Sequence, residues 1–404
     1  MTTAIIITIC TLLLIAYVFD LTSSKTRIPS VILLLLLGWI VRQISTFVGI
    51  TIPNLSALLP ILGTIGLILI VLEGSLELEL NKSKSRMVLK TFVMALLPML
   101  ALSFLVAALF HYYGNFPFKL CLANAIPICI ISSAVAIPSV RSLNSFNKEF
   151  IIYESSLSDI IGVLFFNFIT LNDSITAHAF GGFVVELLLM IVISFIATVG
   201  LALLLNKIGH HIKFVPIILL VILIYAIAKQ YHLPSLLFIM LFGLFLGNLD
   251  ELKYFKWIKK LQPAELSREV HKLKELTIEI TFLVRALFFL LFGYLIETSE
   301  ILNIDSLAWA LVVVALMFII RAVQLKLLKL PLKPLLFIAP RGLITILLFF
   351  SIPVAQNIPL VNKSFIIQVI ILTAFIMMLG LMFLKKESTS EPIEKTTDSI
   401  PAIN

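Results

Sequence analysis

Apolar stretches long enough to cross a membrane recur along the whole chain, and no other feature limits the possible folds so strongly. A helix of roughly 17–25 apolar residues spans the ~30 Å hydrocarbon core of a bilayer. With 60% of its 404 residues hydrophobic and only 13% charged, the sequence excludes a soluble domain and predicts an all-α polytopic membrane protein. We identify thirteen transmembrane segments, near residues 4–19, 28–48, 55–75, 87–110, 118–140, 150–171, 181–205, 213–229, 232–248, 276–296, 303–326, 332–356 and 364–384.

The positive charges gather on one side of these segments. Of the 30 Lys and Arg residues, 23 lie in the C-terminal tail or in and beside the gaps that follow odd-numbered segments, and three lie beside the other gaps. Because cytoplasmic loops carry the excess of Lys and Arg, this bias predicts a protein of the cell membrane with its N-terminus outside and its C-terminus in the cytoplasm. The net charge of +8 therefore reflects topology and does not indicate nucleic acid binding.

Motifs for nucleotide or cofactor chemistry are absent from the sequence. It contains no Walker, Rossmann or HExxH motif. Its cysteines, Cys10, Cys121 and Cys129, lie inside apolar segments without a His or Cys at metal-ligand spacing. We therefore expect that the protein uses neither ATP nor a cofactor. Its expected partners are the surrounding membrane lipids.

Two segments are interrupted near the middle of the membrane. The stretch "ANAIPICIISSAVAIPSV" has prolines on both sides of Ser132 and Ser133, and "PLLFIAPRGLITILLFF" has Arg341 between a proline and a glycine. In lipid, the carbonyl that a proline leaves unpaired needs another partner. The two segments, the fifth and the twelfth, are the middle members of two trios that cross the membrane in opposite directions. This arrangement is typical of an inverted repeat whose half-helices meet at a midplane site.

The sixth segment, "YESSLSDIIGVLFFNF", carries two acids into the membrane, at a cost of at least ~2.5–3.5 kcal/mol each. At ~1.5 Å per residue, Asp159 lies ~13 Å from the inner end, near the midplane. Glu154 lies ~6 Å in, at about the depth of Arg321 on the eleventh segment. Five residues turn Glu154 about 140° away from Asp159, whereas Ser155 shares the face of Asp159. We therefore predict a buried Glu154–Arg321 pair and an Asp159 that faces a cavity.

A third acid, Glu73, lies in the apolar stretch "ILIVLEGSLELEL", one turn before Glu77. It either reaches back to the cytoplasmic surface or stands at the inner mouth of the cavity. The sequence leaves both interpretations open.

Four short motifs occur in order at helices 3, 6, 11 and 12. They are "LEGSLELEL", "ESSLSD", "FIIRAVQ" and "APRGLITILL". Over essentially the whole chain they resemble the monovalent cation:proton antiporter superfamily, in its NhaP-like sodium/proton exchanger branch. The corresponding family motifs are F-E-G-G-L-x-L-D-L, E-S-x-x-N-D, an arginine on helix 11 and G-x-R-G on broken helix 12.

The resemblance implies a role for each charged residue in the membrane. Asp159 would bind the transported cation and the proton in turn. Glu154 and Arg321 would be a structural pair, and Arg341 would offset the half-helix dipoles where helices 5 and 12 cross. The implied monovalent cation site draws its oxygen ligands from Glu73, Ser132, Ser155, Ser158 and Asp159.

The resemblance also implies a homodimer and a division into domains. Residues 1–86 (helices 1–3) and 172–302 (a linker helix 7 and helices 8–10) would form the dimer domain. Residues 87–171 (helices 4–6) and 303–384 (helices 11–13) would form the moving core. Composition further predicts a cytoplasmic interfacial connector near 249–275, anchored by Trp257, and a disordered tail over 385–404.

Two positions depart from the family pattern. Ser158 precedes Asp159 where the family has Asn, and the T-D-P of broken helix 5 reads "SSA" at 132–134, which leaves Arg341 with one acid fewer. An electrogenic relative carries a second carboxylate before the ion-binding Asp. We therefore predict one proton per cation, which is electroneutral exchange.

The expected function is secondary transport in which a monovalent cation, Na⁺ before Li⁺ or K⁺, is exchanged for H⁺ by alternating access. The alternative is a sodium-coupled symporter of a small organic anion on a related inverted-repeat fold, which needs room for a bulkier substrate. An intramembrane enzyme is disfavoured because all six histidines lie near helix ends or in loops. A channel is a further alternative, but a single midplane acid and the broken helices favour a carrier.

Overall fold

Helices make up nearly all of the structure, a computed structural model that describes residues 2–26, 28–49, 55–78, 84–140, 143–172, 176–207, 214–231, 233–249 and 263–383. No β-strand occurs within these ranges. Nine helices there, with the interrupted Phe118–Ser139 counted as one, are long and apolar enough to cross a membrane. The predicted all-α polytopic membrane fold is confirmed, and the count of thirteen transmembrane helices stays a prediction.

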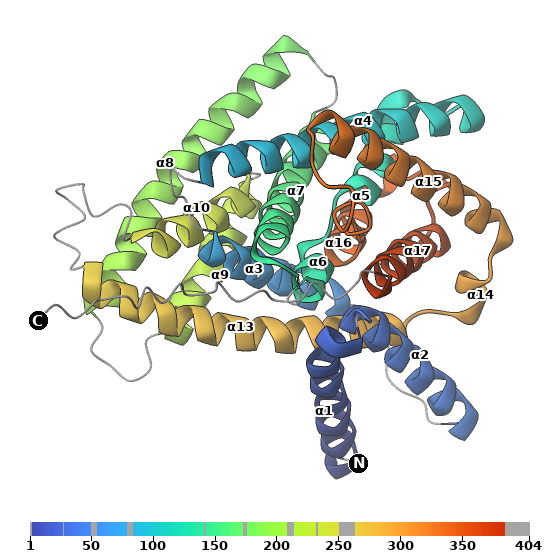
Figure 1. Cartoon of the computed structure of the whole chain (residues 1–404), viewed down its shortest axis with the longest axis horizontal. Helices are drawn as coiled ribbons and strands as arrows, with labels where there is room; N and C mark the ends of the chain where they lie inside the picture. Colours follow the sequence, from blue (N-terminus) through green and yellow to red (C-terminus); the bar gives the residue numbers. More distant parts are fainter. Residues whose placement is uncertain are drawn as a thin grey trace, which may run out of the picture.

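One group of helices packs around α3 and α13. Its members are α1 (Thr2–Thr26), α2 (Ser30–Val48), α3 (Leu58–Glu77), α8 (Ala177–Lys207), α9 (Phe214–Gln230), α10 (Ser235–Gly247) and α13 (Pro263–Tyr294). The helix α13 contacts α2 and α3, and α10 contacts α3, α8 and α9. Figure 1 shows α13 as a long horizontal helix, with α1 and α2 extending below it near its C-terminal end.

A second group surrounds the two broken segments. Its members are α4 (Ser85–Gly114), α5 (Phe118–Cys129), α6 (Ser133–Ser139), α7 (Ser145–Leu171), α15 (Ile304–Leu327), α16 (Leu343–Ser351) and α17 (Lys363–Met382). The helix α4 contacts α5, α7 and α15, and α16 contacts α5 and α7. Two short elements, α14 (Thr298–Ile301) and η2 (Val354–Gln356), lie in the connections. The helix α3 joins the two groups because it also contacts α6, α7 and α16.

Glycines bring α2 and α13 into close contact. A Cβ atom added to Gly38 would lie 2.2 Å from the carbonyl oxygen of Leu290, and one added to Gly293 would lie 2.3 Å from that of Leu35. Small residues let membrane helices approach through their backbones, where packing replaces the hydrophobic driving force. The backbones of α2 and α13 therefore pack closely against each other inside the first group.

The connector predicted at 249–275 differs from the structure in its second half. Residues from Pro263 belong to α13, which runs without a break to Tyr294. Leu266, Val270 and Leu273 are buried at helical spacing, so this basic stretch has an apolar face of its own that packs and continues the helix. The first half, with Trp257, lies outside the described residues.

The twelfth segment, predicted as a broken helix over 332–356, is helical only in its second half. Residues 331–342 form turns and extended chain, and α16 begins at Leu343. Three prolines, Pro331, Pro334 and Pro340, remove backbone N–H donors from this stretch and disfavour helical conformations in the residues before them. The tail predicted as disordered, 385–404, lies outside the described residues.

Candidate ion-binding site

The two broken segments meet backbone to backbone. The N–H of Ser132, in the gap between α5 and α6, donates to the carbonyl oxygen of Pro340 at 2.9 Å. On the other chain, a Cβ added to Gly342 would lie 2.5 Å from a methyl carbon of Val135 and 3.0 Å from the Ser132 hydroxyl oxygen. Only a residue without a side chain fits at this crossing. The broken backbones thus supply hydrogen-bond partners to each other, as a lipid environment requires.

Asp159 lies on α7 beside this crossing and is 1% exposed. Its Oδ2 atom accepts hydrogen bonds from the backbone N–H of Ser133, at 3.3 Å, and from the Ser133 hydroxyl. Its Oδ1 atom is buried and has no hydrogen-bond partner among the described residues. A buried carboxylate oxygen without a partner is unfavourable, and a cation or a proton would remove that cost.

Ser133 is the contact that the sequence reasoning missed. The sequence indicates a role for the backbone around Ser132 and the loss of an acid from the break, whereas in the structure Ser133 provides two donors to Asp159. The signal was present in the family pattern, because Ser133 occupies the central position of the T-D-P motif. The Ser133 hydroxyl therefore lies at the position where the family pattern has an aspartate. It donates a hydrogen bond to Asp159.

The other serines of the predicted ligand set have different surroundings. The Ser158 hydroxyl accepts from the N–H of Ile131 at 3.0 Å and so holds the unwound backbone of the break. The Ser155 hydroxyl is fully buried and donates to the carbonyl of Ile151 at 2.7 Å. The Ser132 hydroxyl is buried without a partner among the described residues. The unpaired oxygens of this set are therefore Ser132 Oγ and Asp159 Oδ1.

Glu73 is buried near the end of α3 and is 7% exposed. The next residue, Gly74, faces α7 so closely that a Cβ there would lie 2.8 Å from the Ser156 hydroxyl oxygen. By contrast, Glu77 is part-exposed and lies 3.8 Å from Lys274 Nζ. Glu73 is thus buried where Glu77 is not, and its place at the inner mouth of a cavity stays a prediction.

Glu154 and Arg321 form the ion pair that the sequence predicts from their matched depth. Arg321 donates from both terminal nitrogens to the two carboxylate oxygens, at 2.6 and 2.8 Å. It also donates to the carbonyls of Leu335 and Ile338 in the extended chain before α16. Both side chains are almost completely buried. The pair thus ties α7 and α15 to the broken twelfth segment.

Arg341 is surrounded by carbonyl oxygens. Its guanidinium donates to Ile128 at 2.7 Å, to Cys129 at 3.2 Å and to Ala339 at 2.7 Å. Ile128 and Cys129 are the last residues of α5, where the unpaired carbonyls of a helix concentrate negative partial charge. These carbonyls stand beside Arg341 in place of the acid that the sequence lacks in helix 5.

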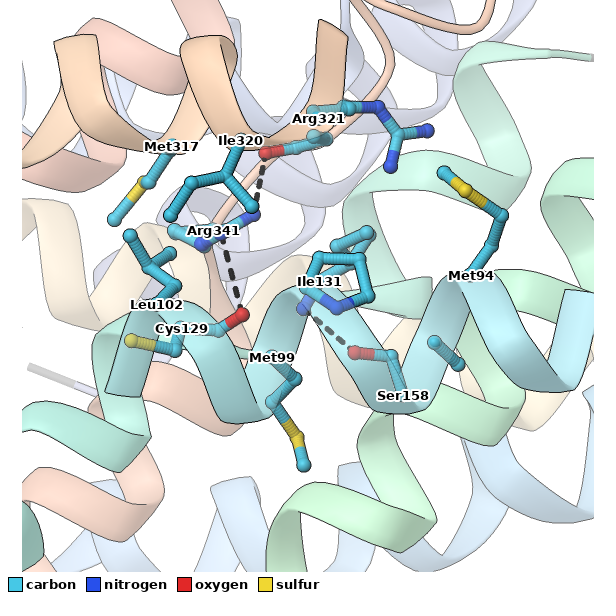
Figure 2. A pocket seen from close by; sticks show the side chains of 13 residues that line it. Met94, Met99, Leu102, Cys129, Ile131, Ser158, Met317, Ile320, Arg321 and Arg341 are labelled. Carbon is cyan, nitrogen blue, oxygen red and sulfur yellow. Dashed lines mark hydrogen bonds between the residues drawn. The ribbon is translucent and has the colours of Figure 1, made fainter. Parts of the chain in front are cut away.

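A small cavity of about 20 Å³ adjoins the crossing (Figure 2). Its lining includes Arg321, Arg341 and Ser158, together with methionines from α4 and α15. It has room for about one water molecule. Ser158 is among its lining residues, whereas Asp159 and Ser133 are not.

Comparison with known proteins gives a family and a fold. Residues 9–385 match the family model described as "Sodium/hydrogen exchanger, transmembrane". The structure is similar to that of the sodium proton antiporter MjNhaP1 from Methanocaldococcus jannaschii at pH 8, with 20% identity, a TM-score of 0.66 and coverage of 94% of this chain and 96% of that one. A second MjNhaP1 structure, from an electron-microscopy map, matches with 21% identity, a TM-score of 0.59 and 95% coverage of both chains. No curated protein sequence matches.

Proposed function

The chain belongs to the sodium/hydrogen exchanger family, and from that premise we propose a secondary transporter that exchanges Na⁺, or another monovalent cation, for H⁺ by alternating access. The observation that carries this proposal is the state of Asp159. It is a single buried carboxylate beside a helix crossing, with one oxygen held by Ser133 and the other unpaired among the described residues.

Competition at Asp159 accounts for the exchange. Removal of water disfavours the charged form of a carboxylate unless a positive charge binds to it. A proton or a dehydrated cation satisfies this need, and the two exclude each other at one oxygen. A hard monovalent cation prefers oxygen ligands. In our proposal these come from Asp159, Ser132 and Ser155, with Glu73 on the adjacent helix.

The arrangement of helices suits alternating access. We assign α4–α7 and α15–α17 to a moving core, and α1–α3 with α9, α10 and α13 to a dimer domain, with α8 as linker. The core holds Asp159, the Glu154–Arg321 pair and both broken segments. The contact between α3 and the core, where Gly74 faces Ser156, is where we place the sliding surface. We propose that the protein is a homodimer of the cell membrane with its C-terminus in the cytoplasm.

A pH-gradient dequenching assay in proteoliposomes tests the proposal. After a proton gradient is set, Na⁺, Li⁺ and K⁺ are added in turn, and we expect Na⁺ to restore fluorescence most strongly. Small organic anions added with Na⁺ serve as the control for a symporter. If a solute gradient drives Na⁺ uptake while no cation dissipates the proton gradient, the exchange proposal is wrong.

Electroneutral exchange is the expected stoichiometry. Serine residues stand at both positions beside Asp159 where a second acid would lie, Ser133 and Ser158, and serine does not titrate in the physiological range. We therefore predict that a voltage imposed with potassium and valinomycin does not drive Na⁺ accumulation, whereas a pH gradient alone does. Voltage-driven accumulation without a pH gradient would contradict this and would point first to Glu73 as a second proton carrier.

A further inference from the structure

A second, larger cavity lies between the beginnings of α4 and α7, away from the helix crossing. Its volume is about 410 Å³, within the range of small-molecule binding sites. Its lining combines Lys84, Arg86 and Lys90 from the start of α4 with Glu149 and Phe146 from the first turns of α7. Two segments far apart in the sequence thus build one hollow.

The charge of this cavity is positive. Its three basic side chains face one carboxylate, a formal excess of two positive charges. Lys84 Nζ lies 3.1 Å from a carboxylate oxygen of Glu149, the only acid among the described residues that line the cavity. Arg86 and Lys90 remain, one helical turn apart, where like charges destabilise a helix. An anion bound between them would remove this repulsion and add charge-assisted hydrogen bonds.

The cavity also has an apolar wall and a position at a membrane surface. Met87 and Phe146 line it, and Phe146 is 47% exposed. The helix α4 is a candidate membrane span that begins at Ser85, so the cavity lies at the level of lipid headgroups. The bias of Lys and Arg predicts that this side is cytoplasmic, where anionic lipids concentrate.

We propose that this cavity binds the phosphate group of an anionic phospholipid. Arg86 and Lys90 bind the phosphate, and the acyl chains lie against Met87 and Phe146. A free phosphate ion shares the first contact but gains nothing from the apolar wall. The bound lipid joins the starts of α4 and α7, two helices of the group that holds Asp159. The proposal does not depend on which ion the protein transports, and its test measures binding without transport.

Thermal unfolding in detergent, with lipid added, tests this inference. The probes are dioleoylphosphatidylglycerol, zwitterionic dioleoylphosphatidylcholine and inorganic phosphate, with native mass spectrometry to count bound lipid. We expect only phosphatidylglycerol to raise the unfolding midpoint. In the double variant Arg86→Gln/Lys90→Gln, we expect the phosphatidylglycerol concentration for half-maximal effect to rise tenfold or more, which corresponds to a loss of about 1.4 kcal/mol of binding free energy.

A matched control removes two lysines at another helix end. Lys326 and Lys329, at the C-terminal end of α15, are both exposed and do not line the cavity. The variant Lys326→Gln/Lys329→Gln should respond to phosphatidylglycerol like the parent. If inorganic phosphate raised the unfolding midpoint of the parent as much as phosphatidylglycerol does, the ligand would not be a lipid. An unchanged lipid response in the Arg86→Gln/Lys90→Gln variant would overturn the site.

Discussion

Asp159→Asn should abolish cation/proton exchange in a protein that still folds. The amide has nearly the same shape as the carboxylate and can still accept the hydrogen bonds that Ser133 donates. It cannot take up a proton at neutral pH, and it offers a cation no negative charge. Because the exchange proposal rests on one carboxylate, the loss should be complete. The dequenching assay measures it, and size-exclusion chromatography checks that the variant is folded.

The matched control for this variant is Asp305→Asn. Asp305 lies in the first turn of α15 and is exposed, so the same chemical change there removes a surface charge only. We expect its exchange rate to equal that of the parent. If Asp159→Asn exchanges cations for protons at the parent rate, Asp159 is not the carrier and the proposed mechanism is wrong.

The second large effect concerns the buried Glu154–Arg321 pair. Removal of one partner leaves an uncompensated charge in the interior, which typically costs ~3–5 kcal/mol. Glu154→Ala and Arg321→Ala should therefore each lower the thermal stability of the purified protein strongly. The double variant should recover part of this loss. Arg321→Ala should be the worse of the two, because it also leaves the carbonyls of Leu335 and Ile338 without their donor.

A double-mutant cycle measures the coupling between the two residues. The surface pair Arg42–Glu297, with an N–O distance of 3.1 Å and partly exposed side chains, is the control, and its coupling should be about 0–1 kcal/mol. Coupling at Glu154–Arg321 no larger than in this control would show that the buried pair does not stabilise the fold.

The sequence alone determined the features that depend on local chain properties. Segment length and hydropathy indicated a polytopic membrane protein, because a bilayer demands about the same apolar length of every crossing helix. Proline positions indicated where the two helices are broken. In the structure these breaks lie at residues 130–132 and directly before Leu343. The depth of Glu154 and Arg321 in their helices was enough to pair them, since rise per residue is fixed in a helix.

Only the tertiary structure decided which groups meet at the crossing. Pro340 accepts from Ser132, which lies 208 residues earlier in the chain, and Arg341 donates to carbonyls at the end of α5. No periodicity within either segment encodes these contacts, because each depends on where the other segment is placed. The same reason hid Ser133, whose two hydrogen bonds to Asp159 exist only once α6 has been set against α7. A hydropathy pattern records how deep a residue lies in the membrane, whereas its hydrogen-bond partners follow from the packing of whole helices.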